Sequence, residues 1–133
     1  MVGRDQELIE SLRRTYDAFS RGDFDFAIEI ADPDVELITT GGFTSLRGAD
    51  RVRAWMEPET IENVSMEPEN FEVAGNNVLV RQLSRGRGVE SGISLEMTFW
   101  ALWTFNEAGF VTRIVAFRDD EEAKARDAAG LRE

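Results

Sequence analysis

Apolar side chains recur every three or four residues in the first part of the chain. Between positions 5 and 20 they are Leu8, Ile9, Leu12, Tyr16 and Phe19. This spacing puts one apolar stripe along a helix and predicts a helix over residues 5–20. Gly22 suits the left-handed conformation that ends a helix, and Asp23 can cap a second short helix. Pro33 is expected to end that second helix.

A strand and a third helix are predicted before residue 60. Residues 34–40 (DVELITT) are mostly apolar or β-branched and predict a strand, which the glycines at 41–42 should end. The third helix is expected to begin near Gly48, to use Asp50 as a cap and to stop before Pro58. Its apolar residues are expected to face the core: Val52, Trp55 and Met56.

After residue 60 the apolar positions alternate, which is the period of a strand. The pattern predicts strands over 62–74, 77–87, 93–105 and 110–117, separated by short turns rich in glycine and asparagine. Three consecutive hairpins imply an antiparallel meander. The segment 119–129 has acidic residues in its first turn and Gly130 behind it, so it predicts a closing helix.

The strand over 93–105 has two different faces. One face is wholly apolar and comprises Ile93, Leu95, Met97, Phe99, Ala101, Trp103 and Phe105. The other comprises Ser94, Glu96, Thr98, Trp100, Leu102 and Thr104. Three N-terminal helices followed by a sheet with one apolar face predict an α+β fold. We expect the helices to pack on a strongly curved, mostly antiparallel sheet, forming a cone-shaped barrel with an internal cavity and a short C-terminal helix.

Composition narrows the possible chemistry. The chain has 133 residues, with 26 acidic and 15 basic side chains, a net charge of −11, and neither cysteine nor histidine. This predicts one domain over residues 1–133, without disulfides, thiol chemistry, zinc–thiolate sites or an imidazole base. Strong negative charge argues against nucleic acid and anionic membranes as partners. No apolar run approaches the roughly 20 residues of a membrane span, so a cytoplasmic protein is predicted.

The order of these signals resembles a known family. The carrying segments are RRTYDAFSRGDFDFAIEIADPDVEL, LRGADRVRAWM, a Gly-Arg-Gly turn and MTFWALWTFNEAGFVTRIVAFRDDEEAKARDAAGL. Together they resemble the SnoaL-like branch of the nuclear transport factor 2-like superfamily over nearly the whole chain. The resemblance implies a cone-shaped α+β domain, often homodimeric through the outer face of its sheet. Such relatives include isomerases, polyketide cyclases, epoxide hydrolases, dehydratases and binding modules, so the reaction stays open.

The family's catalytic positions are mostly filled by residues without acid or base function. Tyr16 matches the tyrosine of ketosteroid isomerases, but their base position falls on or near Thr39 and their protonated aspartate on Ala101. The acidic and histidine positions of polyketide cyclases fall on Ala116 and Ile114. The Asp-Arg-Asp set of epoxide hydrolases has no counterpart in the inward registers. The resemblance therefore assigns no catalytic residue, cofactor or metal.

The remaining candidates point to a ligand pocket. We expect an apolar pocket with Tyr16 as its polar contact and with aromatic and aliphatic walls formed by Trp55, Phe99, Trp103 and Ile114. Arg81 either faces inward and binds an anionic group or faces outward and pairs with acids, because both registers of its strand contain apolar residues. Glu36, if buried, would have a raised pKa and could act as a base.

Three functions follow from this. The first is a domain that binds a small hydrophobic molecule without the usual catalytic acid and base. The alternatives are an enzyme acting on a small hydrophobic or polyketide-like substrate, and a homodimeric protein-interaction module. A homodimer is predicted through the sheet face bearing Trp100 and Leu102, because exposed large apolar side chains mark interfaces.

Overall fold

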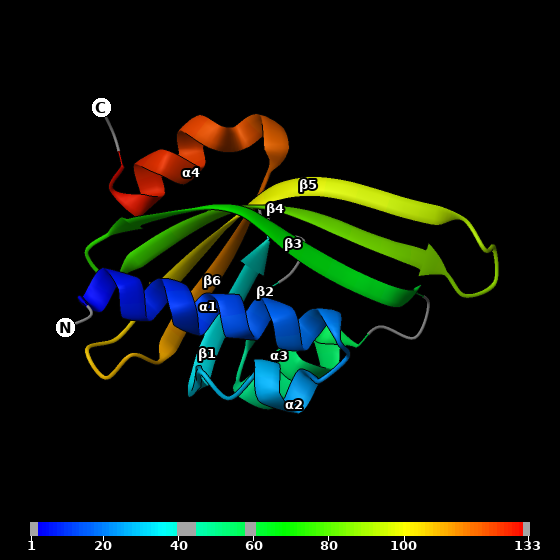
Figure 1. The fold of residues 1–133 in the computed structure, drawn as a ribbon, viewed down its shortest axis with the longest axis horizontal. Helices are drawn as coiled ribbons and strands as arrows, with labels where there is room; N and C mark the ends of the chain where they lie inside the picture. The colour runs from blue at the N-terminus through cyan, green and yellow to red at the C-terminus, as the bar shows by residue number, and fades with distance from the viewer. Residues whose placement is uncertain (1–2, 40–44, 58–60, 132–133) are drawn as a thin grey trace.

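One curved sheet with helices on both faces forms the protein. The computed structural model describes residues 3–39, 45–57 and 61–131. Within these residues, six strands lie in the order β2-β1-β6-β5-β4-β3. Helices α1, α2 and α3 lie on one side of the sheet and α4 lies on the other (Figure 1). The predicted α+β fold with a curved sheet is confirmed.

The predicted N-terminal helices are present. Helix α1 spans Arg4–Ser20, and its stripe Leu8, Leu12, Tyr16 and Phe19 is buried against the sheet. Gly22 has a φ of 79°, the left-handed conformation expected after the helix. Helix α2 spans Phe24–Ala27, and the Asp23 side chain accepts a hydrogen bond from the Phe26 backbone N–H. None of the described helices combines the length and apolar character needed to cross a membrane.

The first strand begins earlier than predicted. Strand β1 spans Ala31–Thr39 and contains Pro33, whereas the sequence pattern placed its start at residue 34. It runs parallel to β6, and the register between them shifts between Ala31 and Glu36. Pro33 lies within this irregular stretch, where its missing N–H costs no ladder hydrogen bond. The predicted break at residues 41–42 lies outside the described residues.

Helix α3 corrects two predictions. It spans Ala49–Met56 after strand β2 (Ser45–Arg47), and its N-cap is Gly48, whose φ of 107° requires glycine. Asp50 lies in the first turn and is not the cap. Trp55 is 40% exposed and does not close the core, because Val52 and Met56 occupy the buried stripe of this short helix. The predicted stop at Pro58 lies outside the described residues.

We therefore expect Trp55→Ala to lower the free energy of unfolding by less than about 1 kcal/mol, as surface substitutions do. Met56→Ala on the same helix is the matched control, since it truncates a buried side chain and should cost about 2–5 kcal/mol. Urea unfolding followed by circular dichroism measures both. A loss for Trp55→Ala as large as that for Met56→Ala would contradict this placement.

The predicted meander forms the rest of the sheet. Its strands are β3 (Ile61–Ala74), β4 (Asn77–Gly88), β5 (Ser94–Phe105) and β6 (Val111–Arg118), each antiparallel to the next. The helix-facing side carries the main core, which includes Val78, Val80, Ala101, Trp103 and Phe105.

The outer face of the sheet carries a second core. The chain continues through the 3₁₀ turn Asp119–Glu121 into helix α4 (Glu122–Ala129), as the sequence predicted. Helix α4 packs against the outer-face side chains Leu79, Trp100, Leu102 and Phe117 through Ala125 and Ala129. Trp100 and Leu102 are each only 5% exposed. The premise that Trp100 and Leu102 are exposed is therefore wrong, because α4 covers them, and homodimerisation itself stays a prediction.

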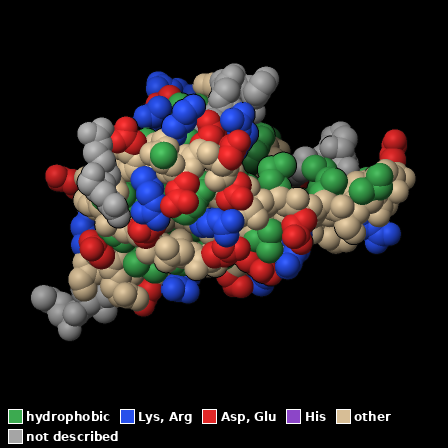
Figure 2. Space-filling view, turned by 90° about the horizontal axis from the view of Figure 1, so that it is seen from above, with side chains coloured by type: hydrophobic (Ala, Val, Ile, Leu, Met, Phe, Trp, Pro, Cys, Tyr) green, Lys and Arg blue, Asp and Glu red, His purple; other side chains and the backbone are tan. Residues whose placement is uncertain are grey.

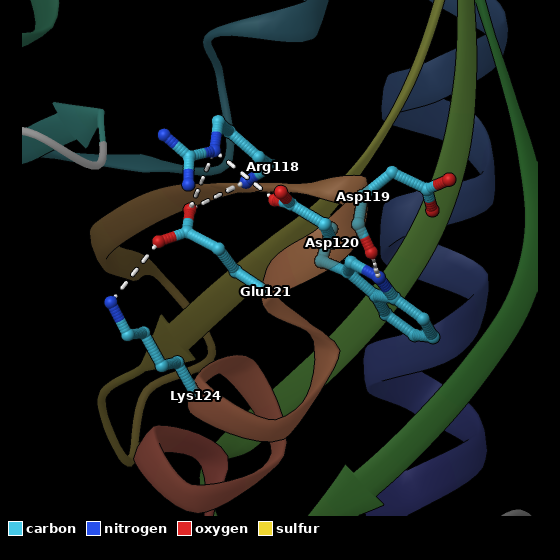
Figure 3. A network of polar contacts seen from close by, with 6 residues as sticks. Arg118, Asp119, Asp120, Glu121 and Lys124 are labelled. Carbon is cyan, nitrogen blue, oxygen red and sulfur yellow. Dashed lines mark hydrogen bonds and ion pairs between the residues drawn. The ribbon is translucent and has the colours of Figure 1, made fainter.

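Polar contacts hold the start of this helical segment in place. The Arg118 backbone N–H donates to a Glu121 carboxylate oxygen at 3.0 Å, and Lys124 Nζ lies 3.4 Å from the other oxygen. The Arg118 guanidinium also pairs with Asp120 at 3.1 Å (Figure 3). These contacts link the end of β6 to the first turn of α4 and keep that helix over the outer face.

Candidate functional site

A small cavity lies between the helices and the inner face of the sheet. Its volume is about 50 Å³. Its wall includes five of the six predicted ligand residues: Tyr16, Trp55, Phe99, Trp103 and Ile114. Trp55, at the end of α3, is 40% exposed, so the cavity opens to solvent beside it.

Three polar groups form a hydrogen-bonded chain in the wall. Tyr16, from α1, donates its hydroxyl hydrogen to Gln82 Oε1 on β4. The same hydroxyl oxygen accepts a hydrogen bond from Trp103 Nε1 on β5 at 3.0 Å. The rings of Tyr16 and Trp103 meet edge to face with centroids 5.7 Å apart. Helix and sheet are thus joined by one buried polar network.

The Gln82 amide nitrogen is the least satisfied member of this network. Among the described residues its only partner is the thioether sulfur of Met66, at 3.2 Å. A thioether is a weak acceptor, and an amide NH₂ group has two N–H donors. Gln82 therefore retains donor capacity beside the cavity.

Burial controls the acid–base behaviour of Tyr16. Desolvation raises the pKa of its phenol well above the ordinary value, and the hydrogen bond from Trp103 opposes this only in part. The phenol is thus neutral at physiological pH. It can donate or accept a hydrogen bond, but it is a poor proton source and is not a base.

Arg81 does not belong to the cavity. It lies on the outer face of β4, two residues from Leu79, and its guanidinium pairs with Glu69 at 2.5 Å and Asp119 at 3.1 Å. The prediction that Arg81 binds a ligand is wrong, because the inward register belongs to Val78, Val80 and Gln82.

Glu36 is not the buried base that the sequence allowed for. Its side chain is partly exposed and pairs with Arg47 at 3.2 Å, while its neighbours Val35 and Leu37 take the inward register of β1. In the described part of the cavity wall there is no charged side chain, and the polar lining residues are Thr15, Tyr16 and Gln82. The Thr15 hydroxyl is already bonded to the Ser11 carbonyl within α1, at 3.0 Å.

Gln82 is the polar cavity residue whose register the sequence pattern left undecided. The only signal was its place two residues after Val80 in one of two equally apolar registers.

A sequence model of the SnoaL-like domain matches residues 12–114. The chain belongs to the SnoaL-like family. Among proteins with curated functions, none matches it significantly.

Solved structures share the fold of this SnoaL-like domain. An NTF2-like protein of unknown function from Burkholderia pseudomallei is 24% identical, with a TM-score of 0.74 over 87% of this chain and 93% of that one. A putative SnoaL-like polyketide cyclase from Jannaschia is 21% identical, with a TM-score of 0.73 over 88% of each chain. An epoxide hydrolase from Mycobacterium tuberculosis is 15% identical, with a TM-score of 0.73 over 94% and 92%.

Three positions that the family resemblance assigns to acids or bases are apolar in this cavity. Ala101, Ile114 and Ala116 all line it. Thr39, at the end of β1, is not among the described lining residues. The described wall of this SnoaL-like domain is therefore suited to holding an apolar molecule against a neutral hydrogen-bonding network.

Proposed function

We propose that this SnoaL-like domain binds a small, neutral, largely apolar molecule that carries one oxygen acceptor. The observation that supports this most directly is the buried Tyr16–Gln82–Trp103 network in an otherwise apolar wall. A ligand carbonyl or ether oxygen would accept from the Gln82 amide better than the Met66 sulfur does. Apolar ligand atoms would contact Phe99 and Ile114.

Charge selectivity follows from the same wall. An anionic ligand would lose its hydration without gaining a cation among the described lining residues, and such desolvation is costly.

Binding is favoured over acid–base catalysis for a related reason. The described wall supplies no carboxylate that could act as a general base. Burial raises the pKa of the Tyr16 phenol, so that it stays protonated and cannot act as a general base either.

Cyclohexanone is a suitable probe, because it is neutral and apolar, and its one oxygen acceptor belongs to a carbonyl group small enough for the cavity while the ring extends to the opening beside Trp55. We expect it to shift the indole N–H resonance of Trp103 in ¹⁵N NMR spectra. Gln82→Met keeps the size of the side chain but removes the whole amide group, both the donor to the ligand and the acceptor of the Tyr16 hydroxyl, and should weaken binding about three- to tenfold. Gln6→Met, on the exposed side of α1, is the matched control and should have no effect.

Cyclohexanecarboxylate tests the charge argument with the same ring. We expect it to bind more weakly than cyclohexanone. If cyclohexanone leaves the Trp103 resonance unchanged, or if the carboxylate binds as tightly, the proposed function is wrong.

A further inference from the structure

The sheet extends beyond the helices that cover it. Strand β5 pairs with β6 only from Phe99 onward, and its first residues pair with β4 alone. The outer parts of β3, β4 and β5 consequently project past α1, α2 and α3 (Figure 1). We call this projection the arm, comprising residues 61–66, 84–88 and 93–98.

One face of the arm is apolar and exposed. Met97, Leu95 and the preceding Ile93 are 66%, 45% and 61% exposed. They continue the same register as Phe99, which lines the cavity, and no register shift interrupts this part of β5. The inner face of the arm and the cavity wall are therefore one continuous apolar surface.

The two faces of the arm differ sharply in polarity. On the outer face Arg85 pairs with Glu67 at 3.1 Å and with Glu96 at 3.2 Å. Figure 2 shows hydrophobic side chains along the projecting arm, while charged side chains of both signs are spread over the visible body of the molecule. Three neighbouring exposed aliphatic side chains on one face mark a binding surface rather than a solvated one.

Residues of strands β3 and β4 form the rest of the inner face of the arm. Met66 lines the cavity and lies opposite Ser84 in the ladder. Gly86 has no side chain, and Ile61 lies close over it, since an added Cβ would be 2.7 Å from Ile61 Cγ2. The Ser84 hydroxyl is buried and has no hydrogen-bond partner among the described residues. This part of the inner face is thus a smooth, apolar strip with one unused hydroxyl at the cavity end.

The small size of the cavity indicates that a larger ligand would also lie on the inner face of the arm. At about 50 Å³ it has room for a small group only, and it opens beside Trp55. A ligand larger than that group must extend beyond the cavity, and the apolar lining continues outward from Phe99 along β5. This continuation is the inner face of the arm.

We propose that the inner face of the arm is an outer subsite for the alkyl tail of an elongated, neutral amphipathic molecule. The oxygen-bearing head of that molecule lies in the cavity, so this inference rests on the proposed function. Met97 and Leu95 contact the tail, and Gln82 contacts the head.

A series of 4-alkylcyclohexanones tests the subsite by calorimetry. Affinity should rise about two- to fourfold for each methylene added, as expected for partial to full burial of a methylene group. Met97→Asp and Leu95→Asp should abolish this dependence on chain length while leaving the affinity for cyclohexanone itself unchanged. Ser94→Asp adds the same charge to the outer face of the same strand and should preserve the dependence.

The outcomes separate this inference from the proposed function. If cyclohexanone does not bind, the proposed function fails. If cyclohexanone binds but affinity is independent of alkyl length, only the outer subsite is wrong. Sedimentation of the wild type and Met97→Asp tests whether a second copy of the chain, rather than an alkyl tail, covers the inner face of the arm. A dimer that this substitution dissociates, with unchanged affinities for the alkyl series, would make the inner face of the arm an interface between copies and would overturn the proposal.

Discussion

Replacing Trp100 by Ala is expected to lower the free energy of unfolding by about 3–5 kcal/mol, the range for truncating a buried large aromatic side chain. Its indole is buried between the sheet and α4, beside Leu102 and Phe117. The indole N–H donates to the Asp119 carbonyl at 3.3 Å, and the Arg126 guanidinium lies 5.7 Å from the ring centre. The substitution therefore removes a large buried side chain from the contact between α4 and the sheet.

Urea unfolding followed by far-ultraviolet circular dichroism measures this loss. Trp55→Ala removes the same side chain from an exposed position and provides the matched comparison. A cost for Trp100→Ala below about 1 kcal/mol, equal to that expected for an exposed site, would show that α4 does not cover Trp100 in solution.

Raising the pH above about 10 is expected to destabilise the fold by about 1.4 kcal/mol per pH unit through Tyr16. Burial raises the pKa of this phenol, so the native chain keeps its proton while the unfolded chain loses it near the ordinary tyrosine pKa of about 10. Above that pH the unfolded state binds fewer protons than the native state, and stability falls as pH rises. The contribution of Tyr16 to stability is fully present below the pKa of this phenol in the unfolded chain. It is lost as the pH rises toward the higher pKa of the phenol in the native chain.

The sequence makes this experiment direct, because Tyr16 is the only tyrosine. Near-ultraviolet tyrosinate absorbance should appear together with the loss of native circular dichroism, and Tyr16→Phe should remove the dependence on pH. Lysine side chains titrate in a similar range, so both proteins should carry Lys124→Arg, which replaces the only lysine. Tyrosinate absorbance that appears near pH 10 while the native spectrum persists would contradict burial of this phenol.

Local periodicity was enough to predict the elements whose pattern involves neighbouring residues. The spacing of Leu8, Leu12 and Tyr16 predicts α1 because a helix repeats every 3.6 residues. The alternation in β5 placed Phe99 and Trp103 on one face and Trp100 on the other, because strands repeat every two residues. Five of the six predicted ligand residues consequently line one cavity.

Long-range packing determines which faces of the sheet are covered and which elements cover them. Both faces of β4 are buried in its central part, one by the N-terminal helices and one by α4, so alternation could not place Arg81 or Gln82. The same ambiguity explains Trp100: its local pattern shows an apolar outer face, but not whether a second chain or the chain's own α4 covers it. Trp55 lies on the short helix α3, whose local pattern does not show which of its apolar residues is left at the surface. Coverage is a property of long-range packing, and a local hydrophobic period does not contain it.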